Sequence, residues 1–203
     1  MPSQKQPGVE PARFESSLER DFYVLLEFDL KVRRWEPQPV RIPVGDGHPS
    51  YVPDVLVTYL DFDVWPQTER TVLYEVKQRK ELRDNWHRWK PRFRAARRYA
   101  KERGWSFRVI TDREIRTGGL LWNAKFLLPY THDEVTDGVH TLLIKTLRHL
   151  GPTTPEKLVA YLAKDPWERA TLLASVWTMV ASRAFLCDLS RPISMHTELS
   201  AYD

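Results

Sequence analysis

Apolar side chains in the first half of the chain follow two spacings. In residues 14–28 and 86–100 the apolar side chains recur at helical intervals, and Gly104 ends the second of these segments. Short runs typical of β-strands separate and follow the two helices, at 31–36, 39–44, 51–61, 71–77 and 105–111. The order helix, strands, helix, strand predicts an α/β core. In the second helix, Trp86 and Trp89 are expected to contact this core rather than DNA.

The second half is mainly helical. A connector over 118–138 begins at two glycines and contains a short expected helix over 120–127. Amphipathic helices are predicted at 139–150, 155–163 and 166–184, followed by short strands at 185–189 and 196–201. Three helices closed by a β-hairpin describe a winged-helix-like module. We therefore expect a disordered proline-rich tail over 1–12, an α/β domain over 13–117, the connector, and a winged-helix-like domain over 139–203.

Two acids and a lysine stand in the predicted hairpin formed by the strands at 51–61 and 71–77. Asp54 lies at the start of the first strand and Glu75 near the end of the second, equally far from a turn near Pro66. Residues equidistant from the turn of an antiparallel pair lie opposite each other. Glu75 and Lys77 share one face of their strand, because side chains alternate. All three groups are expected to meet at one end of the sheet.

Two carboxylates that lie this close repel each other unless a cation stands between them. Their oxygen atoms are suitable ligands for Mg²⁺ or Mn²⁺. Lys77 would then orient an attacking water or stabilise charge on a phosphate. The motif Pro53-Asp54 … Glu75-Val76-Lys77 is typical of PD-(D/E)xK nucleases, which share a restriction-endonuclease-like core. The alternative is structural: a Glu–Lys surface pair, with Asp54 capping a turn.

Basic charge begins at this motif and continues beyond it. Residues 77–103 contain twelve Lys or Arg and three acids, a local charge of +9, whereas the rest of the chain carries −5. Double-stranded DNA is the expected partner of such a segment, although a solvated basic helix face is the alternative. The candidate DNA contacts are Arg79, Lys80, Arg94, Arg97, Arg98 and Lys101.

Several classes of protein are excluded by composition. The one cysteine rules out an internal disulfide and a cysteine-rich zinc module, and the six histidines lack metal-ligand spacing. No glycine-rich phosphate loop indicates an ATPase, and no apolar run approaches the length of a membrane helix. We expect a cytoplasmic protein.

Five segments resemble, in order, the TnsA family of endonuclease subunits of Tn7-like transposases. They are SSLERDFYVLLEFD (16–29), WEPQPVRIPV (35–44), YVPDVLVTY (51–59), LYEVKQRKEL (73–82) and RFRAARRYAKERGWSFRVITDREIR (92–116). The resemblance implies Mg²⁺-dependent cleavage of the 5′ strands at transposon ends in a prokaryotic cell, at the nucleoid when active. It also implies a DDE-type transposase partner similar to TnsB and an AAA+ ATPase regulator similar to TnsC.

The family's site residues fall on Glu19, Asp54, Glu75 and Lys77, of which the three acids would bind the metal. The position of Glu75 is Gln in some relatives. Glu19 also fits the S-x-x-E capping box that starts at Ser16. In that case its carboxylate would accept a hydrogen bond from the backbone at the helix N-terminus instead of binding metal. Glu15 is a rival on the same helix edge, and the resemblance favours Glu19. We assign no role to Gln38.

Two other functions stay open. One is an autonomous PD-(D/E)xK nuclease of restriction or repair type, and the other is a non-catalytic DNA-binding or assembly protein, against which the intact acid–lysine set argues. Residues 139–203 have seven basic and six acidic side chains, a poor charge balance for independent DNA binding. We expect protein docking or a structural role for this unit.

Overall fold

The computed structural model describes residues 5–6, 15–45, 47, 49–62 and 65–202. The chain forms two compact units, Met1–Thr117 and Gly118–Asp203. Of the tail predicted over 1–12, only Lys5 and Gln6 are described. The Lys5 ammonium donates hydrogen bonds to three carbonyl oxygens near the end of the first helix, those of Leu26, Glu27 and Asp29.

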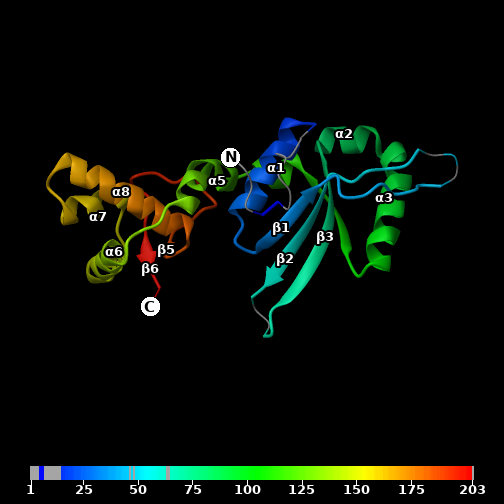
Figure 1. Ribbon diagram of the computed structural model, residues 1–203. Helices are drawn as coiled ribbons and strands as arrows, with labels where there is room; N and C mark the ends of the chain where they lie inside the picture. The colour runs from blue at the N-terminus through cyan, green and yellow to red at the C-terminus, as the bar shows by residue number, and fades with distance from the viewer. Residues whose placement is uncertain (1–4, 7–14, 46, 48, 63–64, 203) are drawn as a thin grey trace. The chain divides into compact units, whose positions relative to one another are not determined.

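A four-stranded mixed sheet organises the first unit (Figure 1). Its strands are β1 (Val32–Pro37), β2 (Val55–Asp61), β3 (Thr68–Lys77) and β4 (Ser106–Thr111), which lie in that order. Strand β2 runs antiparallel to both β1 and β3, and β4 runs parallel to β3. This α/β arrangement fits the predicted restriction-endonuclease-like core.

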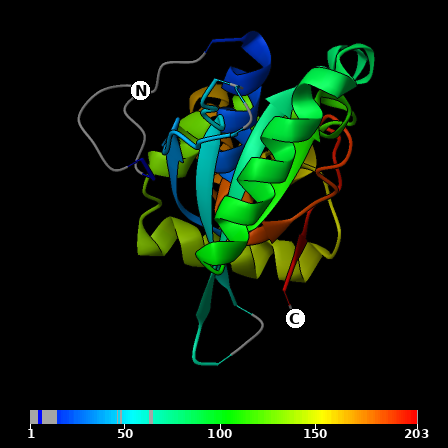
Figure 2. The same cartoon turned by 90° about the vertical axis from the view of Figure 1, so that its right-hand side faces the viewer.

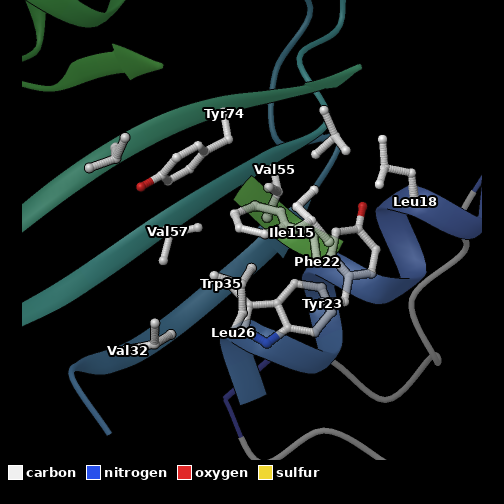
Figure 3. Close-up of a cluster of buried hydrophobic side chains, with 12 residues drawn as sticks. Leu18, Phe22, Tyr23, Leu26, Val32, Trp35, Val55, Val57, Tyr74 and Ile115 are labelled. Atoms are coloured by element: carbon white, nitrogen blue, oxygen red, sulfur yellow. The ribbon is translucent and has the colours of Figure 1, made fainter. Parts of the chain in front are cut away.

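Helix α1 (Ser17–Phe28) and the short α4 (Asp112–Arg116) pack against one face of the sheet. Figure 3 shows apolar side chains of α1 directed at β1, β2 and β3, with Ile115 of α4 among them. The buried members of this cluster are Leu18, Phe22, Tyr23, Leu26, Val32, Trp35, Val55, Val57, Val72, Tyr74, Val76 and Ile115.

Helix α3 (Trp86–Glu102) covers the opposite face and follows the short α2 (Arg79–Asp84) (Figure 2). Its small buried residues Ala95 and Ala96 pack with Leu73 of β3, so the helix backbone approaches the sheet closely. Side chains alternate along a strand. Glu75 and Lys77 therefore lie on the same side of β3 as Leu73, the side that α3 covers.

The prediction of a strand at 39–44 is wrong. This segment forms only an isolated bridge between Ile42 and Tyr51, through backbone hydrogen bonds in both directions. Pro39 and Pro43 have no N–H group and cannot sustain a ladder. The bridge nevertheless fixes Tyr51 against the α3 side of the sheet. Strand β2 begins after Asp54 rather than at Tyr51.

The second unit is mainly helical. It consists of α5 (Leu120–Leu127), the 3₁₀ helix η1 (Leu128–His132), α6 (Asp137–Leu150), α7 (Pro155–Leu162), α8 (Pro166–Ala181), and the antiparallel pair β5 (Phe185–Leu186) and β6 (Ser200–Ala201). The predicted order of helices is present, but both strands are much shorter than the spans 185–189 and 196–201. The predicted winged-helix identity stays a prediction.

The predicted connector packs within this second unit. Asn123 of α5 is fully buried, donates to the carbonyl oxygens of Leu189 and Arg191, and accepts from the N–H of Ile193. A Cβ atom on Gly119 would lie 2.2 Å from the backbone of Arg191, so only glycine fits there. Among the residues described in both units, no helix has the length and apolar character needed to cross a membrane.

Candidate active site

Asp54, Glu75 and Lys77 meet at one end of the sheet, as the hairpin symmetry predicts. The β2–β3 register pairs Val55 with Tyr74, which places Asp54 beside Glu75. The Lys77 ammonium lies 2.9 Å from Glu75 Oε1 and 3.6 Å from Asp54 Oδ2. The surface-pair alternative does not describe this geometry, since Glu75 is 1 % exposed. Two carboxylates and one ammonium thus share a largely buried position.

Asp54 is held at both its backbone and its side chain. Its N–H donates to the carbonyl oxygen of Tyr74 at 3.1 Å, and its Oδ2 accepts from the N–H of Val76 at 2.6 Å. Its own carbonyl oxygen accepts from the Gln38 N–H at 2.9 Å and from the Tyr23 hydroxyl at 3.3 Å. These contacts fix the carboxylate at the start of β2 without requiring a turn cap.

Glu75 has a partner that the sequence did not indicate. The buried Tyr51 hydroxyl donates a short hydrogen bond to Glu75 Oε2, while Lys77 contacts the other oxygen. Tyr51 reaches this position through its bridge to Ile42, which joins residues across a loop rather than within a strand. No sequence spacing relates Tyr51 to Glu75, so this contact was not predictable from the pattern.

The two carboxyl groups are hard to ionise together. Burial, followed by the charge of Glu75, raises the pKa of Asp54 to about 8, although Lys77 and the Val76 N–H oppose this rise. Burial also raises the pKa of Glu75, against the opposing effects of Lys77 and Tyr51. The site therefore lacks enough positive charge to keep both acids ionised.

The two neighbouring donors keep their protons. Burial favours the neutral form of Lys77, but the charges of Glu75 and Asp54 outweigh this effect and raise the pKa of Lys77 above its ordinary value. Burial and the adjacent Glu75 raise the pKa of Tyr51. Lys77 is thus a cation and Tyr51 a hydrogen-bond donor throughout the neutral pH range.

The donor set of Asp54 and Glu75 fits a hard divalent cation. Both are oxygen ligands, and a second positive charge would offset the burial that raises both pKa values and the charge of Glu75 that further raises the pKa of Asp54. Within the described ranges, no group of three or more His, Cys, Asp or Glu side chains gathers as a metal site. The predicted third acid, Glu19, is therefore not assembled with the other two in this structure.

Glu19 is buried near the N-terminus of α1 and forms local hydrogen bonds. Its N–H donates to Ser16 Oγ at 3.1 Å, the Ser16 hydroxyl donates to its Oε1 at 2.9 Å, and the Glu15 N–H donates to its Oε2 at 2.9 Å. The Ser16 side chain thus caps the helix, but the Glu19 carboxylate accepts from the Glu15 N–H rather than from the Ser16 N–H that a full capping box would use. The charge of Glu19 nevertheless contributes to the raised pKa of Asp54, so the two acids interact electrostatically.

Gln38 lies at the edge of the site and has a left-handed backbone with φ of 45°. Its N–H bonds the carbonyl oxygen of Asp54, and its side-chain amide donates to Glu15 Oε1 at 2.9 Å. A left-handed conformation is unfavourable for a residue other than glycine, Asn or Asp. The residue thus ties β1, α1 and Asp54 together.

The six candidate DNA contacts are all exposed. Arg79 and Lys80 lie in α2, directly after Lys77, and Arg94, Arg97, Arg98 and Lys101 lie in α3. Arg79 and Lys80 also line a groove, together with Leu82, Arg83 and Trp86. The core contact predicted for Trp86 is only partial, because its side chain is 50 % exposed and meets the core only through an edge contact with Phe93, with ring centroids 6.0 Å apart.

Trp89 and Arg92 also lie at the site, and neither was a sequence candidate. The Trp89 ring is stacked on Phe93, with centroids 5.8 Å apart, and the Lys77 ammonium lies 4.8 Å from the Trp89 ring centre. Helical spacing alone gave Trp89 a core role. Its contact with Lys77 depends on how α3 crosses the end of β3.

Comparison with protein families gives one match. Residues 29–112 match the family model described as TnsA-like endonuclease N terminal. The match includes Asp54, Glu75 and Lys77, the whole four-stranded sheet and α3, but not Glu19 or the second unit. No curated protein matches the chain. The acid–lysine cluster and the sheet that carries it lie within the matched range, and the first unit of this chain therefore belongs to the TnsA-like endonuclease family.

Proposed function

We propose that this chain is the endonuclease subunit of a Tn7-like transposase and that it hydrolyses the 5′ strands at the transposon ends. The observation that carries the proposal is the convergence of Asp54, Glu75 and Lys77 at one sheet end, inside the segment that matches the TnsA-like family. The autonomous nuclease remains the alternative, and activity of the isolated chain distinguishes the two.

Asp54 and Glu75 would hold Mg²⁺ or Mn²⁺ through their carboxylate oxygens, with Glu19 as a proposed further ligand. The metal would polarise the phosphate and lower the pKa of water. Tyr51 fixes the orientation of Glu75 by its hydrogen bond, and the Val76 N–H fixes Asp54. Lys77, held as a cation, would stabilise the charge that develops on the scissile phosphate.

The DNA backbone would pass over α2 and α3, whose exposed cations continue from Lys77. Phosphate contacts of this kind position the duplex without reading its sequence. Recognition of the ends would then come from a DDE-type transposase similar to TnsB, and timing from an AAA+ regulator similar to TnsC.

The proposal is tested by 5′-strand cleavage of end-bearing DNA in the assembled system. We expect Asp54→Ala and Glu75→Ala to abolish cleavage while the circular dichroism spectrum stays native. Glu36→Ala, which removes an exposed acid from β1, is the matched control and should cut at the wild-type rate. Wild-type rates in either site variant would contradict the assignment.

A further inference from the structure

Two cations of the first unit share one aromatic ring. The Lys77 ammonium lies 4.8 Å from the Trp89 ring centre, and the Arg92 guanidinium carbon lies 5.0 Å from it. The two charges are thus within about 10 Å of each other, since both are measured to the same point. A cation within about 6 Å of an indole is attracted to the ring. Trp89 therefore holds the lysine of the acid–lysine cluster and a second cation that the cluster does not contain.

Trp89 is a firmly supported platform. It stacks on Phe93, whose ring lies 5.6 Å from Phe107 of β4, so the indole is anchored through α3 to the sheet. Its ring N–H is buried and, among the described residues, donates to no acceptor. A buried donor without an acceptor is unfavourable and is uncommon in proteins. The ring contacts of Trp89, and not a hydrogen bond of its N–H, therefore determine its position.

Arg92 is half-buried beside the acids but is not paired with them. In the part of the chain that the structure describes, no carboxylate forms an ion pair with its guanidinium. Its charge opposes the raised pKa of Tyr51, which places it near the Tyr51–Glu75 hydrogen bond. A half-buried arginine held by an aromatic ring keeps its donor groups available for an anion that the protein itself does not supply.

We propose that Arg92 binds the DNA backbone phosphate next to the phosphate that Lys77 faces. Trp89 would fix the spacing of the two cations. This inference rests on the proposed function, because it needs DNA at the acid–lysine cluster. Arginine suits the role, since its planar guanidinium donates two parallel hydrogen bonds to one phosphate. Arg92 is a strand-positioning residue, and Lys77 acts at the reacting phosphate.

The first test is the salt dependence of duplex binding by the full chain, measured by fluorescence anisotropy with Ca²⁺ present. Loss of one phosphate contact reduces the slope of log K against log salt by about 1. We expect this reduction for Arg92→Gln and recovery of the slope for Arg92→Lys, which keeps the charge. Arg103→Gln is the matched control, because Arg103 also lies over a ring, that of Tyr99, about 16 Å further along the helix. Its slope should stay unchanged.

The second test locates the phosphate. Neutral methylphosphonate linkages are placed one at a time around the cut in single-turnover cleavage by the assembled system. One linkage next to the scissile phosphate should slow the wild type and the Arg103→Gln variant but cause no further loss in Arg92→Gln. Thermal unfolding of Arg92→Gln should match the wild type.

The outcomes separate the two proposals. A wild-type chain that does not bind duplex contradicts the proposed function. A wild-type chain that binds, with an equal slope and the same linkage profile in Arg92→Gln, overturns the role of Arg92 alone. A lower melting temperature for Arg92→Gln with unchanged DNA binding assigns Arg92 to packing on Trp89 and also overturns it.

Discussion

Tyr51 supports the site through a single hydroxyl group, the donor to Glu75 Oε2. Both side chains are buried, so removal of the donor leaves a carboxylate oxygen without a partner. Such a loss typically costs about 1–3 kcal/mol. We predict that Tyr51→Phe lowers the free energy of unfolding by this amount and raises the Mg²⁺ concentration needed for half-maximal cleavage.

The control for this prediction is Tyr59→Phe, which removes the bond between the Tyr59 and Tyr74 hydroxyls elsewhere in the sheet. It should lower stability without changing the metal requirement. An unchanged metal requirement in Tyr51→Phe would show that the hydroxyl only supports packing.

Glu19 has a capping geometry and an electrostatic influence on Asp54, and one substitution separates these roles. Glutamine keeps one amide oxygen that can accept from the Glu15 N–H, and its amide nitrogen can donate to the Ser16 hydroxyl. Glu19→Gln should therefore keep the melting temperature of the wild type but lower the cleavage rate at least tenfold if the carboxylate takes part in catalysis. Ser16→Ala, which removes the cap, should cost about 1 kcal/mol of stability and leave cleavage intact. Full cleavage activity in Glu19→Gln would assign the residue to the helix terminus alone.

Asp54 makes the metal-free protein sensitive to pH. Its folded pKa of about 8 lies above the ordinary value of 3.8, so between these values the folded state holds a proton that the unfolded state has lost. The stabilisation that this proton gives the folded state is complete below pH 4 and declines as the pH rises towards 8. One pKa unit corresponds to about 1.4 kcal/mol. We predict that Asp54→Asn is more stable than the wild type by at least about 1 kcal/mol at pH 8, and equally stable at pH 4.

Urea unfolding in EDTA at pH 4, 6 and 8 checks this prediction. Added Mg²⁺ should stabilise the wild type at pH 8 but not the variant, because binding to the folded state adds to stability. A parallel pH dependence in the two proteins would contradict it.

At the scale of elements, α3 has two separate tasks. Its buried face consists of Phe93, Ala95, Ala96 and Ala100, which seat it on the sheet. Its exposed side carries four of the predicted DNA contacts. The same helix therefore positions Trp89 over Lys77 and presents a charged surface to solvent.

Neutralising this surface should change DNA binding but not folding. We predict that joint substitution of Arg94, Arg97, Arg98 and Lys101 by Gln reduces the slope of log K against log salt by about 2–4, since each phosphate contact contributes about 0.9. Filter binding to a duplex of arbitrary sequence measures this slope. Four exposed cations of the second unit, Lys145, Lys157, Lys164 and Arg169, provide a charge-matched control. An unchanged slope in the α3 variant would place the DNA elsewhere.

At the scale of the whole molecule, we propose that catalysis belongs to the first unit and partner binding to the second. The TnsA-like match ends at residue 112, and the second unit has a nearly neutral charge. The sequence of residues 1–117 contains no base-reading motif, and the helix at 166–181 is largely apolar. We therefore infer that the site preference of this nuclease comes from partners.

We predict that the purified chain with Mg²⁺ is nearly inert on plasmid DNA that carries the transposon ends, and that it cuts when the transposase and ATPase partners are added. Gel assays of nicked and linear products measure this difference. The Asp54→Ala chain with both partners is the background control. Efficient, site-specific cutting by the chain alone would favour the autonomous nuclease instead.

The sequence by itself determined those features that depend on neighbours along the chain. Helical spacing located α3 and α5–α8, and hairpin symmetry brought Asp54 and Glu75 together with Lys77 on one strand face. Antiparallel pairing and side-chain alternation are local rules, so they act wherever the strands form. The strand predicted at 39–44 does not form, because its prolines lack the N–H groups that a ladder of hydrogen bonds needs.

Only the tertiary structure decided which distant residues complete the site. Tyr51 reaches Glu75 through a loop bridge, and the Trp89 ring of α3 meets both Lys77 and Arg92. The pKa of Asp54 likewise depends on burial by these elements together. Sequence spacing contains no measure of such contacts, since they arise from packing between elements rather than from the order of residues within one.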